Sequence, residues 1–174
     1  MLLTACRSDT ETSNYGFELG DLNARLENRQ INISTHLDMR LSRPVREALD
    51  SGIPLTVEFI ARHRQRGRWL SGVENQTRKR WDIRYLPLSR HYALSDTDSG
   101  QQETFARFRH LQVRMNQVLL ALPLASGSSG PQQLEVKVRL RLASLPAPMR
   151  LPALLSREWQ LHSAWKQWQF ELPA

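Results

Sequence analysis

The sequence is poor in the residues that build most recognisable sites. Its single cysteine, Cys6, rules out an internal disulfide, and no apolar run approaches the roughly 18 residues of a membrane-spanning helix. The five histidines include no His-x-x-x-His pair, and the chain has no Walker A loop, Gly-x-Gly-x-x-Gly or Gly-x-Ser-x-Gly motif. We therefore expect no metal or other cofactor, and a binding module rather than an enzyme.

Lysine is also scarce, because only three of the 24 basic residues are lysines and the rest are arginines. Against 17 acidic residues they leave a formal net charge of +7. Between Arg40 and Arg90 there are 12 basic and five acidic residues, so the whole surplus lies in this segment. Arginine richness can arise from genome base composition, but its concentration here favours anionic partners. With 174 residues, 40% of them hydrophobic, the chain can bury one substantial core.

The opening stretch Leu3-Thr4-Ala5-Cys6 resembles the lipobox of bacterial lipoproteins, in which the cysteine thiol receives a diacylglyceryl group. A complete signal also has a charged start and about 7–15 apolar residues, whereas only Met1 and Leu2 precede the motif. Either the true signal begins further upstream or the match is accidental. The polar residues after Cys6 are typical of a tether. We predict a lipobox and flexible tether over residues 1–20, with lipid attachment at Cys6, and a single β-rich domain over residues 21–174.

Alternating apolar and polar side chains predict strands. The alternation is seen at residues 30–41, 55–62, 80–85, 91–94 and 134–142. The second and third of these flank Ser71-Gly72, as expected for an antiparallel hairpin. Between the first and second, Ser42, Pro44 and Gly52 are typical of the N-cap, first turn and C-terminal end of a short helix.

Apolar residues from Phe105 to Leu122 recur every three or four positions, which predicts one long amphipathic helix. Near the C-terminus, Trp159 and Trp165 share one parity and Trp168 the other, which predicts a bulge near Lys166-Gln167. We expect these tryptophans to pack on the domain. The predicted fold class is α+β and β-rich, with an antiparallel sheet or sandwich of about six to seven strands, one long amphipathic helix and one short helix.

The predicted hairpin concentrates the positive charge. If Leu55, Val57 and Phe59 share a buried face with Trp81 and its odd-numbered neighbours, the even positions lie on the outer face. Like charges would then oppose one another across the strands, a cost that favours an anionic partner. A splayed, solvated hairpin tip is the alternative. The candidate partner-binding residues are Arg62, Arg64, Arg66, Arg68, Arg78, Arg80 and Arg84.

Four stretches carry a resemblance to a known family: ALDSGIPLTVEF, the hairpin from Arg62 to Tyr85, LPLSRHYALS, and the closing W-x-L-x-S-x-W-x-x-W. They resemble a proteobacterial family known as domain of unknown function 4390, over residues 22–170. These are packing motifs, so the resemblance implies no chemistry. Members of that family typically look exported, and their genes often lie near a sensor histidine kinase. The resemblance therefore implies an envelope location and a link to envelope signalling.

These features favour a non-enzymatic binding or signalling-accessory module of the cell envelope, on the periplasmic side and lipid-anchored, with the basic hairpin as its recognition surface. The expected partners are an envelope protein such as a membrane sensor kinase, an anionic lipid or a cell-wall polymer. The alternative is a cytoplasmic nucleic-acid-associated protein that uses the same arginines, with Trp69 and Trp81 as stacking groups. No zinc-finger, helix-turn-helix or RNA-recognition signature accompanies them.

Overall fold

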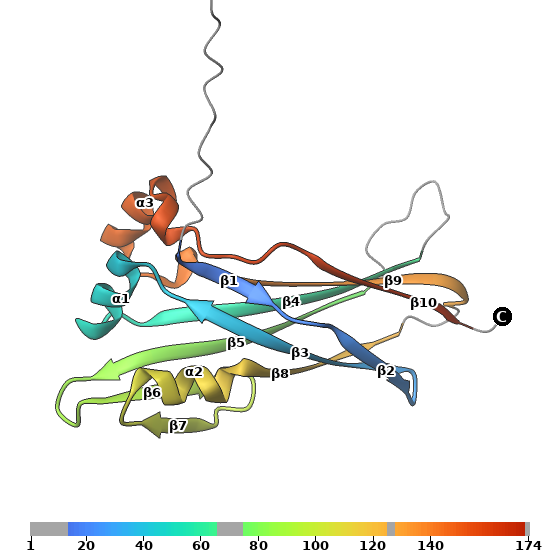
Figure 1. Cartoon of the computed structure of the whole chain (residues 1–174), viewed down its shortest axis with the longest axis horizontal. Coiled ribbons are helices and arrows are strands. Elements are labelled where there is room, and N and C mark those ends of the chain that lie inside the picture. Colours follow the sequence, from blue (N-terminus) through green and yellow to red (C-terminus); the bar gives the residue numbers. More distant parts are fainter. Residues whose placement is uncertain (1–13, 66–74, 125–127, 173–174) are drawn as a thin grey trace, which may run out of the picture.

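The protein is built from two antiparallel sheets that share one hydrophobic core (Figure 1). The computed structural model describes residues 14–65, 75–124 and 128–172. The smaller sheet consists of β1 (Gly16–Leu19), β2 (Asn23–Glu27), β3 (Gln30–Arg40) and β8 (Gln117–Pro123). The larger has the order β10-β9-β4-β5-β6-β7, with β4 (Leu55–Gln65), β5 (Asn75–Leu86), β6 (His91–Asp96), β7 (Gln102–Phe105), β9 (Gly130–Leu140) and β10 (Lys166–Leu172).

Helical segments lie at one end and along one side of the two sheets (Figure 1). They are α1 (Arg43–Asp50), α2 (Phe108–Asn116) and α3 (Ala147–Leu155), with the 3₁₀ turns η1 (Leu142–Ser144) and η2 (Arg157–Trp159). No helix within the described ranges is both long and apolar enough to span a lipid bilayer. The β-rich, antiparallel class predicted from the alternation is confirmed, and the described residues form ten strands in place of the predicted six to seven.

The core forms between the alternating faces of the two sheets. Along β3, Ile31, Ile33 and Leu37 are buried, while their polar neighbours face outward. Across the core, Phe59 on β4 is fully buried, and its ring meets Trp81 of β5 edge-on with centroids 5.1 Å apart. The predicted hairpin parity is confirmed, because odd residues of β4 pair with odd residues of β5. The predicted turn at Ser71-Gly72 lies outside the described residues.

The short helix is confirmed as α1. Pro44 lies in its first turn, Val45 and Leu49 are its buried residues, and Gly52 just beyond its end has a φ of +90° that favours glycine. Ser42 occupies the N-cap position, but its hydroxyl donates to the carbonyl oxygen of Glu158 at 2.6 Å in place of capping the helix. Ser42 therefore ties the start of α1 to η2.

The single long helix predicted for residues 105–122 is wrong. Helix α2 ends at Asn116, and the chain continues as β8, in which Val118, Leu120 and Leu122 are buried while Leu119 is exposed. The run Val-Leu-Leu-Ala-Leu is apolar at every position, so it satisfies a helical stripe and a strand face equally well. The open edge of β3 decides between them, because β8 pairs with β3 over seven residues.

Ordered structure starts earlier than the predicted tether allows. Residues 16–19, placed in the tether, form β1, which pairs with the C-terminal half of β3 and buries Phe17. Strand β2 pairs with the N-terminal half of β3 on the same side. Between them the amide of Gly20 donates to the carbonyl oxygen of His36 at 2.8 Å. The sequence of residues 16–27 alternates too weakly to predict these two short edge strands.

The C-terminal segment crosses from α3 and η2 back to β9. His162 pairs with Arg139 and Lys166 pairs with Val136, so three residues of the terminal strand, 163–165, lie opposite two of β9. This extra residue confirms the predicted bulge, slightly earlier in the chain. As a result, Trp165 turns to the outer face of the larger sheet, where its ring meets Arg62. Trp168 instead packs against the core, and its ring stacks on that of Phe170 with the two ring centroids 4.7 Å apart.

Candidate functional site

The candidate site is the outer face of the larger sheet, where the neighbouring strands β5, β4 and β9 each present charged residues. The face comprises even-numbered residues of β4 and β5 and odd-numbered residues of β9, as the pairing register requires. We call it the basic face. Its charged residues are Arg62, Arg64, Arg78, Arg80, Arg84, Lys137 and Arg139, with the acids Glu58, Asp82 and Glu135.

The structure places five of the seven predicted arginines on this face. Arg62 and Arg64 lie on β4, and Arg78, Arg80 and Arg84 lie on β5. Arg66, Arg68 and the predicted lipid-attachment residue Cys6 lie outside the described residues.

The expected opposition of like charges across the hairpin is wrong. In the register, Arg80 lies opposite Glu58 and Arg62 lies opposite Gln76. On its other side Glu58 faces Arg139 of β9. The Glu58 carboxylate accepts from Arg80 Nε at 3.0 Å and from Arg139 Nη2 at 2.6 Å, and the side chain is only 1% exposed. Attraction across strands therefore replaces repulsion in the middle of this face.

This arrangement controls the protonation of Glu58. Burial alone would raise the pKa of its carboxyl group, but the hydrogen bonds and positive charges of Arg80 and Arg139 outweigh burial and lower the pKa below its ordinary value of 4.5. Glu58 is therefore ionised at neutral pH, and it holds both guanidinium groups in place.

Glu135 of β9 forms a second charged cluster further along the face. Its carboxylate lies 2.6 Å from Arg62 Nε and 3.3 Å from Arg64 Nε. The amide nitrogens of Gln133 and Gln167 donate to its other oxygen at 3.0 and 3.3 Å. Two of the predicted arginines are thus already engaged by a buried carboxylate.

Between these two clusters is a row without an acid. Arg78 of β5 and Lys137 of β9 flank Ile60 of β4, each directly opposite it in the register. Among the described residues, neither cation lies within ion-pair distance of a carboxylate. The Trp165 ring extends over the same region. Its centroid lies 3.7 Å from the Arg62 guanidinium carbon and 5.8 Å from Lys137 Nζ. The row is a part of the face where an outside anion meets cations that no carboxylate of the described residues neutralises.

The sequence pattern predicts that the hairpin arginines share an outer face. It does not predict which residues lie beside them there, namely Glu58, Glu135, Lys137 and Arg139. The signal for β9 was present, since Glu135, Lys137 and Arg139 alternate with buried residues. The alternation shows which side chains share a face, but not that β9 lies beside β4.

A large open groove adjoins the basic face at the free edge of β5. It has a volume of about 1110 Å³ and lies between the first half of β5 and the strands β2, β3 and β8. Its lining includes Arg25, Asn32, Arg78 and Lys79. Lys79 is engaged by Asp96, with Nζ and Oδ2 3.0 Å apart. Arg78 is shared with the basic face, but Glu27 and Asp98 also line the groove, so its charge is mixed.

No metal-binding cluster accompanies these surfaces in the part of the chain that the structure describes. Across residues 14–65, 75–124 and 128–172, no three His, Cys, Asp or Glu side chains come together as a metal site. The buried histidine, His63, places Nε2 2.6 Å from Oε1 of Gln132, whose amide in turn donates to the carbonyl oxygen of Ser129 at 2.8 Å. This polar pair joins β4 to β9.

Comparison with known proteins gives one match. A family model described as domain of unknown function (DUF4390) matches residues 14–169. No curated protein matches the chain, and no solved structure matches it. The match covers the whole basic face and both sheets except the last three residues of β10.

Proposed function

Because the chain belongs to the DUF4390 family, whose function is unknown, we propose its function from its own sequence and geometry: it is a non-enzymatic binding module of the cell envelope. It is held there by a lipid on Cys6, and its basic face binds an acidic surface of a partner protein. An envelope sensor protein is the kind of partner that the family resemblance favours.

The row formed by Arg78, Ile60 and Lys137 carries the proposal. Neighbouring strands lie about 4.8 Å apart, so the backbones of Arg78 and Lys137 are separated by roughly 10 Å. That spacing suits two carboxylates presented side by side on a partner. The flanking guanidinium groups are already fixed by Glu58 and Glu135, so binding costs less side-chain entropy than it would for free arginines.

The test is a double charge reversal, Arg78→Glu with Lys137→Glu. We expect it to weaken the binding of polyglutamate by at least about tenfold, because two attractive charges on the row become repulsive toward the polyanion. Fluorescence anisotropy at low salt measures the binding. The fold should survive, since both residues are outside the ion pairs of the described chain. Arg64 and Arg80 are unsuitable, because a glutamate there would face Glu135 or Glu58.

A matched control is Arg107→Glu with Arg109→Glu, both exposed and remote from the basic face at the start of α2. It changes the net charge equally, and we expect it to leave polyglutamate binding nearly intact. An equal loss in the two double variants would reduce the effect to net charge and contradict the proposal. Binding of single-stranded DNA far above that of polyglutamate would instead favour the nucleic-acid alternative.

The anchor has its own prediction. We expect the protein purified from the membrane fraction of its native host to begin at Cys6 and to carry a diacylglyceryl group and an acyl chain, as shown by intact mass. Cys6→Ser should move the protein out of the membrane fraction. An unmodified chain that starts at Met1, recovered in the soluble fraction, would refute the anchor without bearing on the basic face.

A further inference from the structure

Helix α3 carries an apolar surface that the fold does not cover. Leu151, Leu154 and Leu155 are 67%, 56% and 80% exposed. They are spaced i, i+3 and i+4, so they share one face of the helix. The helix is attached through its opposite side, where Ala153 is buried and Met149 packs against the core. Three exposed leucines on one nine-residue helix form a patch, unlike the single exposed residues Leu88, Val113 and Leu119 elsewhere.

A cationic groove lies directly beside these leucines. It has a volume of about 460 Å³, and its lining includes Lys137, Arg139, Arg141 and His162 together with Leu140 and Leu154. Leu154 therefore belongs to both the groove and the apolar patch. Residues 141–165 contain three arginines and one acidic residue. Positive charge next to exposed leucine is the combination that an anionic lipid surface binds, with phosphate at the cations and acyl chains at the leucines.

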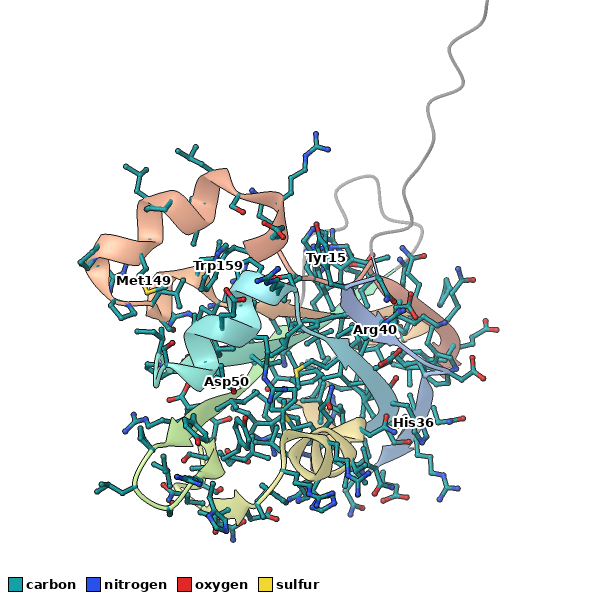
Figure 2. The ribbon with its side chains drawn as sticks, turned by 60° about the vertical axis from the view of Figure 1, so that its left-hand side comes forward. Tyr15, His36, Arg40, Asp50, Met149 and Trp159 are labelled. Atoms are coloured by element: carbon teal, nitrogen blue, oxygen red, sulfur yellow. The ribbon has the colours of Figure 1, made fainter. Side chains whose placement is uncertain are left out.

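The position of β1 agrees with a bilayer at this end of the molecule. The pairing of Gly16 with Arg40 and the hydrogen bond from Ser42 to Glu158 bring the start of β1 to the end that holds α1 and α3 (Figure 1). In Figure 2, Tyr15, Trp159 and Met149 all lie in the upper half of the molecule, with Tyr15 near the middle and Met149 toward the left edge. Tyr15 lies nine positions after Cys6, and a chain of nine residues spans at most about 32 Å. A lipid on Cys6 therefore keeps this end near the membrane, a step that rests on the proposed function.

We propose that the α3 end is a membrane-contacting surface. Leu151, Leu154 and Leu155 enter the interfacial region of an anionic bilayer, and Arg141 binds lipid phosphate groups in the adjoining groove, beside the Arg139 guanidinium that Glu58 already engages. The contact fixes the orientation of the domain, and the part of the basic face around Arg62 and Arg64 extends away from the lipid.

The experiment uses the full chain with Cys6→Ser, so that no covalent lipid contributes. We expect it to sediment with vesicles of phosphatidylethanolamine and phosphatidylglycerol, less so as salt is added, and only weakly with phosphatidylcholine vesicles. Adding Leu151→Ser, Leu154→Ser and Leu155→Ser should reduce binding to the anionic vesicles by at least about tenfold, because the apolar area available for insertion is lost.

The matched control adds Leu88→Ser, Val113→Ser and Leu119→Ser, which remove three exposed apolar side chains away from α3. We expect this control to bind vesicles like the parent chain, and both triple variants to keep the parent melting temperature. Equal binding by the α3 variant, an equal loss in the control, or no preference for anionic vesicles would overturn the proposal. A concentration-dependent dimer that the α3 substitutions abolish would assign the patch to a second copy of the chain and overturn it as well.

These outcomes are separable from those of the proposed function. The vesicle measurement does not depend on Cys6, so a missing lipid modification leaves it interpretable. Polyglutamate binding by the α3 triple variant should equal that of the parent, because Arg78 and Lys137 are unchanged.

Discussion

Replacing Glu58 by glutamine is expected to lower the free energy of unfolding at pH 7 by about 2–3 kcal/mol, below the usual cost of breaking a buried ion pair because its partners remain solvated. The side chain is 1% exposed, whereas Arg80 and Arg139 are 36% and 46% exposed. Glutamine keeps the shape and one acceptor but loses the charge that attracts two guanidinium groups. Urea denaturation followed by far-UV circular dichroism measures the change.

Glu103→Gln provides the control. Glu103 pairs with Arg114 at 2.8 Å, but both side chains are nearly half exposed, so we expect a loss of less than about 1 kcal/mol. Equal losses in the two variants would mean that Glu58 is hydrated in solution and does not organise the basic face.

The same pair of proteins tests the pKa of Glu58. Its pKa in the folded state lies below the ordinary value of 4.5, so the folded protein binds this proton less readily than the unfolded chain does. The resulting stability is fully present above about pH 4.5 and is lost as the pH falls through the folded-state pKa. We expect the stability difference between the parent and Glu58→Gln to shrink steadily below pH 4.5 in denaturation curves taken at a series of pH values. A difference that stays constant with pH would contradict the assignment.

Phe59→Ala is expected to have the largest effect on stability, a loss of about 3–5 kcal/mol, the range measured for truncating a buried aromatic side chain. The ring is fully buried at the centre of the larger sheet and packs edge-on against Trp81. Its removal leaves a cavity between two sheets whose pairing holds the backbone apart, so the neighbours can close only part of the space. Urea denaturation monitored by tryptophan fluorescence reports the loss, and a changed emission of Trp81 in the folded state reports the cavity.

Phe59→Leu separates the cavity from the aromatic contact. It retains most of the volume, and we expect it to cost less than about 1.5 kcal/mol. A loss of that small size for Phe59→Ala too would show that the two sheets are not packed together at this point.

Much of the fold follows from local sequence pattern. The alternation along residues 30–41 predicts β3 and its buried face, and the shared parity of β4 and β5 predicts which side of the hairpin faces the core. The signals around Ser42, Pro44 and Gly52 predict α1. These predictions succeed because a period of two or a helix-end signal is a property of neighbouring residues, whatever the rest of the chain does.

The candidate site follows from sequence only in part. The arginines of the hairpin were predicted to be on one outer face, and five of them are. The net charge of this face was not predictable from the hairpin alone, because Glu135, which pairs with Arg62 and Arg64, and Arg139, which shares Glu58 with Arg80, come from β9. Glu135 is 73 residues beyond Arg62, and Arg139 is 81 residues beyond Glu58.

The sequence by itself determined the faces of the strands, the position of the hairpin and the excess of positive charge on it. Only the tertiary structure decided that residues 117–123 form a strand, that β9 lies beside β4, and that α3 leaves its leucines uncovered. The physical reason is that alternation sorts side chains between two faces without specifying the neighbouring strand. That choice is made when open edges pair and the two sheets close over one core. The carboxylates that neutralise most of the basic face, and the row of cations that they leave unneutralised, result from that closure.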